Sequence, residues 1–174
     1  MKSKILAIIL CVLISSSVAA KNLNIESESI LLDKKKEVTI FQNNVVVKTL
    51  DNNLIKSDYA EYNSKNKIIL LKNNVTAQDG EGNLIETEYA EYNELDEIFI
   101  SRGLTKITTS QKFEIIGENI NYDNKNKIIK SSNAATLTDV DNNTITLSNF
   151  EFENDVGIFK SIGKIKIRDK LENS

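Results

Sequence analysis

The chain has 174 residues, with 22 Lys and Arg against 25 Asp and Glu, no His, no Pro and a formal net charge of −3. The absence of His removes the usual general base near neutral pH and the commonest metal ligand. The slight acidity and the lack of a basic stripe disfavour nucleic acid as a partner, because affinity for nucleic acid depends on Lys and Arg at phosphates. Carboxylate or Ser/Lys chemistry would need a converging cluster that the sequence does not show. We therefore expect no enzyme, no cofactor and no metal site.

The first twenty residues have the pattern of a secretory signal peptide. Two lysines precede an apolar run over residues 5–14, and Val18-Ala19-Ala20 follows as a small-residue cleavage site. The run is too short to cross a bilayer, which needs about 20 apolar residues. We predict a cleaved leader over residues 1–20 and a single secreted domain over residues 21–174.

A repeat of 30 residues runs through the rest of the chain. The segment SDYAEY at residues 57–62 returns as TEYAEY at residues 87–92, and equivalent segments start at residues 27, 117 and 147. Five copies thus follow one another without an insertion or deletion. The register is supported by two aligned columns: Val38, Ile68, Ile98, Ile128 and Ile158 in one, and Asn43, Asn73, Gly103, Asn133 and Gly163 in the other. Self-similarity at such a period indicates a repeat architecture.

Each copy is predicted to contain two strands that bend at their middles. In the second copy, residues 67–78 alternate apolar and polar side chains, which is typical of a strand with one buried face. Asn73 falls in an inward column in the middle of this strand, where Gly or Asn favours a bend. In the strand predicted over residues 84–92, the apolar phase shifts between Thr87 and Ala90, which indicates a β-bulge.

These features predict an all-β fold, a bent antiparallel β-jellyroll or β-taco solenoid built from the five repeats. Ten or eleven strands would stack side by side in a V- or U-shaped section with the apolar columns inside. Small polar residues in these columns, such as Ser101 and Thr105, predict a loosely filled interior. The hydroxyls of Tyr62, Tyr92 and Tyr122 suit the rim of a groove better than a sealed core.

The repeat resembles the OstA-like family of lipopolysaccharide transport proteins. The shared motif is Tyr-Asn, a short polar turn, an apolar residue and then Gly/Asn-Asn-Val. It reads Tyr62-Asn63, Ile69 and Asn73-Asn74-Val75 in the second copy, and Tyr92-Asn93, Phe99 and Gly103-Leu104-Thr105 in the third. The resemblance covers residues 23–170, although Asn replaces the family's glycine in three of the five copies. The family includes the periplasmic bridge protein LptA, the soluble part of LptC and the N-terminal domain of LptD.

The resemblance implies a periplasmic protein that holds the acyl chains of lipopolysaccharide in an apolar groove and catalyses nothing. It implies other OstA-like jellyrolls of the transport bridge as partners, with head-to-tail self-association as a further expectation. The absence of a long C-terminal segment favours the LptA type or an isolated LptD-like N-terminal domain. The residues expected to line the groove are Ile69, Leu71, Val75, Ile85, Tyr92, Phe99, Ile107, Ile115, Tyr122, Ile129, Leu137 and Phe159.

The last copy predicts an edge strand that is available for assembly. The residues of this assembly edge are Ile162, Lys164, Ile165, Lys166, Ile167 and Arg168. Soluble proteins usually blunt an edge with Pro, a bulge or charge. Here the inward side is apolar and the outward side basic, so we expect β-augmentation with an acidic edge such as one carrying Glu26 and Glu28.

Other interpretations remain open from the sequence alone. The apolar columns could form a sealed core, and the chain could be a polysaccharide-binding β-repeat or a self-assembling surface protein. The run Lys34-Lys35-Lys36 is either a solvated turn or a contact for lipid phosphates at one mouth of the groove. The segment from Asp139 to Asn143 resembles the start of a calcium loop, but Thr144 stands where that loop needs glycine.

Overall fold

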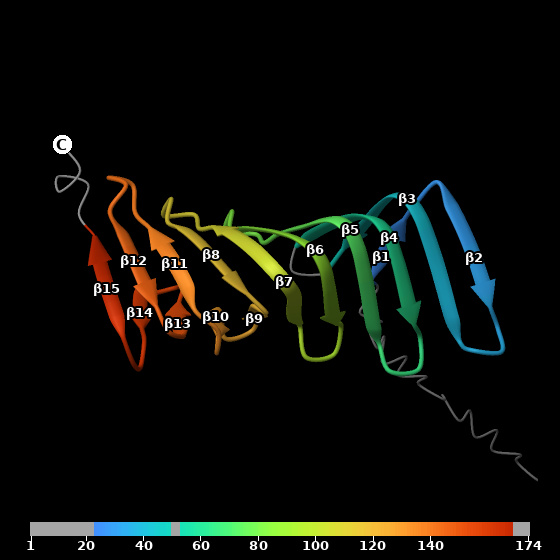
Figure 1. Ribbon diagram of the computed structural model, residues 1–174. Coiled ribbons are helices and arrows are strands. Elements are labelled where there is room, and N and C mark those ends of the chain that lie inside the picture. The colour runs from blue at the N-terminus through green and yellow to red at the C-terminus, as the bar shows by residue number, and fades with distance from the viewer. Residues whose placement is uncertain (1–22, 50–52, 169–174) are drawn as a thin grey trace, which may run out of the picture.

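The computed structural model describes residues 23–49 and 53–168, in which 15 strands form one sheet and there is no helix. The strands lie side by side from the N-terminal end, in blue, to the C-terminal end, in red (Figure 1). Their bounds are β1 (Asn24–Glu26), β2 (Ser29–Asp33), β3 (Val38–Lys48), β4 (Leu54–Asn63), β5 (Ile68–Gln78), β6 (Leu84–Asn93), β7 (Ile98–Thr108), β8 (Glu114–Glu118), β9 (Asn121–Asp123), β10 (Ile128–Ser131), β11 (Ala135–Thr138), β12 (Thr144–Leu147), β13 (Phe150–Glu153), β14 (Ile158–Lys160) and β15 (Ile165–Arg168). The predicted leader lies outside the described residues.

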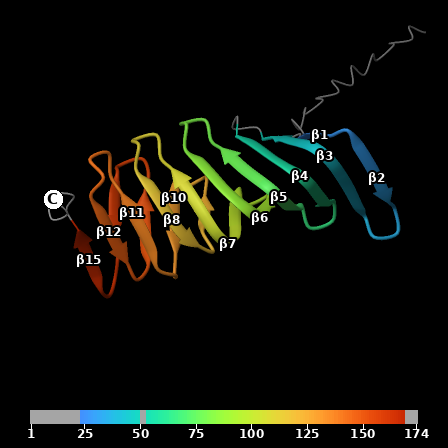
Figure 2. The same cartoon turned by 45° about the horizontal axis from the view of Figure 1, so that its top comes forward.

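The sheet folds over into two leaves. In the first leaf the strand order is β1-β3-β4-β5-β6-β7-β8-β11-β12-β15. In the second leaf the order is β2-β3-β4-β5-β6-β7-β9-β10-β13-β14, so the long strands β3 to β7 belong to both leaves (Figure 2). All pairs are antiparallel. This arrangement is the bent β-jellyroll that the repeat predicts.

Local backbone geometry explains why the long strands bend. Asn43 and Asn73 have φ of 62°, and Gly103 has φ of 78°. Because L-residues rarely enter this left-handed region, Gly and Asn are the residues that tolerate it best. The predicted bend is confirmed, but Asn73 does not point inward. Asn73 and Asn74 both have positive φ and are exposed, and the pairing of β5 with β6 skips them.

The predicted β-bulge is also confirmed. The register of β6 against β7 shifts between Thr87 and Tyr89, and that of β4 against β5 shifts between Lys56 and Tyr59. The extra residue lies on the partner strand, because Gly103 and Leu104 of β7 stand opposite Glu88 of β6, and Thr87 and Ala90 are both buried. Between β1 and β2, and throughout the last two copies, the strands break where the others bend, as at Asn133 between β10 and β11. These breaks are why there are 15 strands rather than the ten or eleven expected.

The turns of the second leaf repeat one conformation five times. Glu37, Lys67, Glu97, Lys127 and Gly157 share positive φ values between 55° and 68°. The turns also form a hydrogen-bonded row, because in each turn after the first a backbone N–H donates to a carbonyl of the preceding turn. Examples are Ser64 to Glu37 at 3.1 Å and Glu94 to Lys67 at 3.0 Å. This row forms one lip of the mouth of the V.

Candidate functional site between the two leaves

The apolar columns of the repeat meet in the space between the two leaves. Cross-strand pairs hold them in register, for example Ile85 opposite Ile107 and Ile107 opposite Ile115. Of the twelve residues predicted to line a groove, eleven are at most 5% exposed, and Phe159 is partly buried against them. The predicted inward phase is therefore correct. These side chains pack on one another as a core, and their contact with acyl chains stays a prediction.

The small polar residues that predicted a loosely filled interior are hydrogen-bonded and buried at Ser101 and Thr105. Thr105 Oγ1 donates to Ser101 Oγ at 2.7 Å, and Ile120 N donates to the same oxygen at 3.0 Å. Ser101 thereby replaces a backbone bond that is lost where β8 gives way to β9. The cavity between Ile55 and Phe99 has about 20 Å³, room for about one water molecule.

Hydrogen bonds and one ion pair close the mouth of the V in the middle copies. Tyr122 Oη donates to Asp79 Oδ2 at 2.7 Å, and Asn154 Nδ2 donates to Glu81 Oε2 at 2.7 Å. Lys127 Nζ lies 3.3 Å from Glu81 Oε1. Asp79 and Glu81 belong to a turn of the first leaf, whereas their three partners belong to the second leaf. These contacts form a latch of five residues across the mouth.

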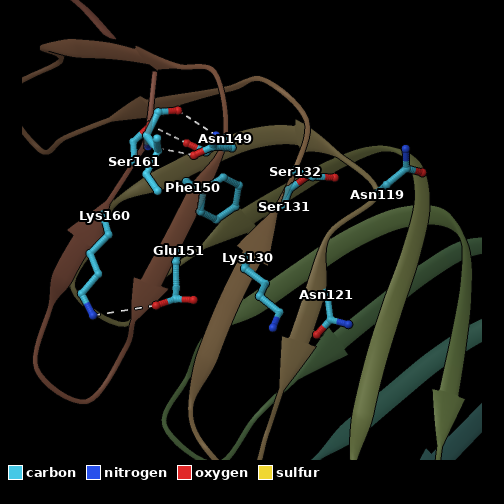
Figure 3. Close-up of a pocket in the computed structure, with 11 residues that line it drawn as sticks. Asn119, Asn121, Lys130, Ser131, Ser132, Asn149, Phe150, Glu151, Lys160 and Ser161 are labelled. Carbon is cyan, nitrogen blue, oxygen red and sulfur yellow. Dashed lines mark hydrogen bonds and ion pairs between the residues drawn. The ribbon is translucent and has the colours of Figure 1, made fainter. Parts of the chain in front are cut away.

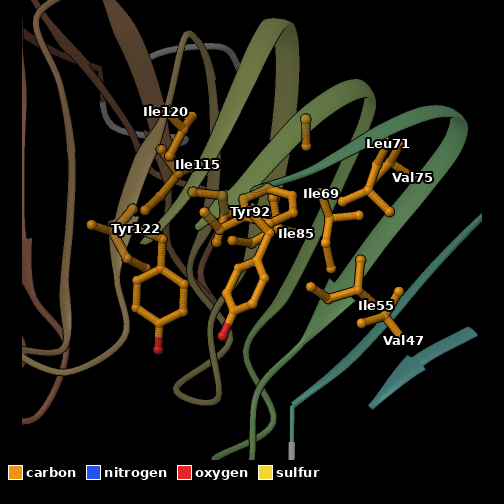
Figure 4. Close-up of a cluster of buried hydrophobic side chains, with 14 of the residues drawn as sticks. Val47, Ile55, Ile69, Leu71, Val75, Ile85, Tyr92, Ile115, Ile120 and Tyr122 are labelled. Carbon is orange, nitrogen blue, oxygen red and sulfur yellow. The ribbon is translucent and has the colours of Figure 1, made fainter. Parts of the chain in front are cut away.

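The tyrosines lie at the mouth side of the core, as the sequence suggested. In Figure 4, Tyr92 and Tyr122 point their hydroxyls in the same direction, away from Ile69 and Leu71. Tyr122 is nevertheless only 5% exposed. Its burial, followed by the hydrogen bond to Asp79, raises the pKa of the Tyr122 phenol, which therefore keeps its proton as a donor. The latch could not be predicted from the sequence, because the period of the repeat does not set the offset between the leaves.

The interior is open at the N-terminal end. Ile30 and Leu32 pair with the inward residues Phe41 and Thr39, so they face the interior, but they are 60% and 57% exposed. Beside them lies a depression of about 410 Å³ that has both polar and apolar side chains in its lining. It is lined by Leu23, Asn24, Ile25, Phe41, Tyr62, Lys67 and Glu94.

The interior is also open at the C-terminal end. Ile165 and Ile167 pair with Leu147 and Ile145, which places them on the inward face, although they are 49% and 73% exposed. Of the predicted assembly edge, four residues form β15. Ile162 and Lys164 precede that strand, and Ile162 N donates instead to Asn149 Oδ1 at 2.9 Å.

Four strands offer a free edge. Within the described residues, β1 and β2 pair only with β3, β14 pairs only with β13, and β15 pairs only with β12. The free edges thus lie at the same two ends where inward apolar side chains are exposed. Both ends therefore expose unpaired strand edges and apolar side chains, which another jellyroll would cover.

A further depression, of about 550 Å³, lies among the last strands (Figure 3). Its rim carries Lys130, Glu151 and Lys160, and the last two pair at 3.8 Å. Phe150 lines it but is only 3% exposed. Because its floor is sealed and two of its charges are paired, we assign no ligand to it.

In residues 23–49 and 53–168 no three acidic, His or Cys side chains come together as metal ligands. Over the same residues, no helix has the length and hydrophobicity needed to cross a membrane. Asp139 Oδ1 accepts the backbone N–H groups of Asp141 and Asn143 at 2.9 Å each, so this carboxylate caps its own turn.

No family model and no curated protein matches the sequence. Among solved structures, the chain is similar to LptH, described as the LptA homologous periplasmic component of the lipopolysaccharide transport device from Pseudomonas aeruginosa. That match has 11% identity and a TM-score of 0.35, and covers 86% of this chain and 96% of the other. A second match, at 6% identity and a TM-score of 0.17, is the TCP10 domain of Danio rerio CPAP, covering 86% of this chain and 95% of the other. At these scores neither match indicates a function, which has to come from the geometry of this chain.

Proposed function

We propose that the chain is a periplasmic, non-enzymatic carrier of lipopolysaccharide that shields acyl chains between its two leaves. The main support is that the inward apolar side chains form a continuous row from one open end of the V to the other. At both ends of this row, apolar side chains are exposed. The resemblance to OstA-like proteins supports the same ligand. A sealed structural core would have no need of Ile30 and Leu32 at one end and Ile167 at the other.

Loading requires the leaves to part, which breaks the contacts of the latch. An entering acyl chain covers the apolar side chains that separate, so little apolar surface is lost to water. The cost falls on the latch, whose three contacts contribute roughly 1 kcal/mol each. An acyl chain gains about 0.8 kcal/mol for each buried CH₂ group. For a chain of about twelve carbons that enters from water, this gain exceeds the cost of breaking the latch.

Lipid extraction from the exported protein tests the proposal. Protein purified from the periplasm without detergent should yield an acylated glycolipid in organic solvent, and should exchange it with added glycolipid. Recovery of bound polysaccharide without acyl chains, or of lipid-free protein that takes up no glycolipid, would favour one of the rival functions.

We further propose that copies of this chain, or related jellyrolls, join head to tail at the free edges. Lys166 and Arg168 on β15 would face the acidic edge of β1, which carries Glu26. Replacing Ile165 by Pro removes a backbone donor from β15 and should abolish assembly while the earlier copies stay folded. The Ile165→Ala variant keeps the backbone and should still assemble. Equal assembly of both variants, measured by light scattering, would show that the joint lies elsewhere.

A further inference from the structure

Positive charge gathers beside the open N-terminal end of the interior. The turn between β2 and β3 and the turn between β4 and β5 lie next to each other, because Ser64 N donates to Glu37 O at 3.1 Å. The next turn in the row is acidic, with Glu94, Asp96 and Glu97. The five lysines of the first two turns, which we call the basic lip, are Lys34, Lys35, Lys36, Lys65 and Lys67.

Lys67 is the member of the basic lip that lines the depression at this end. Its Nζ donates to Tyr62 Oη at 3.2 Å, and Tyr62 Oη donates in turn to Glu94 Oε2 at 3.0 Å. The hydrogen bond to Tyr62 raises the pKa of Lys67, so the amine stays charged. Among the described residues Lys67 forms no ion pair with a carboxylate. The ammonium therefore has N–H groups available for an incoming anion.

The floor under Lys67 is apolar and continuous with the core. Phe41, which is 8% exposed, belongs to the buried cluster, and Leu23 and Ile25 pack against that cluster from β1 and the residue before it. All three line the same depression as Lys67. The acyl chain of a ligand whose anion binds at Lys67 would therefore meet these apolar side chains first.

We propose that the basic lip docks the phosphorylated head group of an acylated ligand, while the acyl chain enters over Phe41 and Ile25. The inference rests on the proposed carrier function. It adds the direction in which the ligand lies, with the head group at the N-terminal end. The charge of Lys164, Lys166 and Arg168 at the other end does not serve this purpose. Lys166 and Arg168 pair with Thr146 and Thr144, which places them on the outer face of the first leaf.

The lip lies on turns and not on strand edges, so it stays accessible when β1 pairs with another chain. Glu94 is an opposing charge at the site, since it accepts the hydrogen bond of the Tyr62 hydroxyl and would repel a phosphate. In the first turn, Lys36 Nζ lies 3.9 Å from Asp33 Oδ2. Substitutions at the lip and at Glu94 should therefore change affinity in opposite directions, which a merely structural role of these residues would not produce.

Titration of the full chain with three probes tests the inference: a phosphorylated, short-chain acylated disaccharide, its dephosphorylated form, and inorganic phosphate. The Lys35→Gln/Lys65→Gln/Lys67→Gln variant should bind the phosphorylated probe about tenfold more weakly, since it loses charge-assisted contacts to phosphate. It should bind the dephosphorylated probe within about twofold of the unaltered chain. Glu94→Gln should tighten binding of the phosphorylated probe by about twofold.

The matched control removes three lysines from the outer faces, in the variant Lys56→Gln/Lys72→Gln/Lys130→Gln, and should leave both affinities unchanged. Equal loss in the control, or an unchanged affinity of the lip variant for the phosphorylated probe, overturns the inference. Inorganic phosphate that binds as tightly as the phosphorylated probe overturns it too, because the site would then recognise a free anion. If the unaltered chain binds neither acylated probe, the carrier function itself fails.

Discussion

The middle copies and the end copies share one repeat but have opposite environments. Ile85 and Ile107 in the middle are at most 2% exposed, whereas Ile30 and Ile167 at the ends are 60% and 73% exposed. All four face the interior through their strand pairs. A copy buries its inward face only where it has a neighbour on each edge and the other leaf opposite. The same sequence pattern thus produces a core in the middle and an unfinished surface at each end.

The two ends also differ from each other. At the N-terminal end the most exposed inward residues, Ile30 and Leu32, lie on β2 of the second leaf. At the C-terminal end Ile165 and Ile167 lie on β15 of the first leaf, whereas Phe159 on β14 stacks on Phe152 at 4.1 Å. The leaves are therefore offset along the stack, and each end overhangs on a different leaf. An overhang of this kind suits a joint in which one jellyroll continues the next.

The largest expected effect is a difference in stability between the middle and an end. Ile107→Ala should lower the free energy of unfolding by about 2 to 5 kcal/mol, because it leaves a cavity among packed neighbours. Ile167→Ala removes the same atoms from an exposed site and should cost less than about 1 kcal/mol. Urea denaturation of the two variants measures both values. Similar losses would mean that the ends are as closed in solution as the middle.

A smaller effect is expected at the latch. Tyr122→Phe removes the donor to Asp79 and should lower stability at neutral pH by about 1 kcal/mol. Because the pKa of Tyr122 is raised above its ordinary value of 10.0, the folded state favours the protonated phenol. The stabilisation is complete below pH 10 and is lost as the pH rises above 10.

Unfolding experiments between pH 8 and pH 11 check the sign of this effect. The unaltered chain should lose its advantage over Tyr122→Phe as the pH passes about 10, since only the unaltered chain carries the titrating group. Parallel curves for the two proteins across this range would show that the phenol is not held in the latch.

The smallest effect is expected at a bend. Asn73→Ala should destabilise by about 1 kcal/mol, because alanine tolerates the left-handed region less well than asparagine. Asn73→Gly should be near neutral, since glycine enters this region freely. Thermal unfolding of the pair measures the difference. A more stable alanine variant would mean that the bend does not keep this φ.

The sequence predicted well whatever is local and repeated. The period of 30 gave the strands, the bend at Asn73 and the bulge after Thr87, because each depends on neighbouring residues. The contacts between the two leaves could not be predicted in this way. The pairing of Asp79 with Tyr122 depends on the offset between leaves, and the bonds of Ser101 depend on a strand break that periodicity does not mark.

Photocrosslinking in cells tests the central claim most directly, namely that acyl chains enter between the leaves. Leu71 and Lys72 are adjacent on β5, but Leu71 is completely buried in the interior and Lys72 lies over the Tyr59 ring, 5.2 Å from its centroid, on the outer face. A photoreactive residue at Leu71 should capture glycolipid, and one at Lys72 should capture none. Capture at both positions, or at Lys72 alone, would contradict the account.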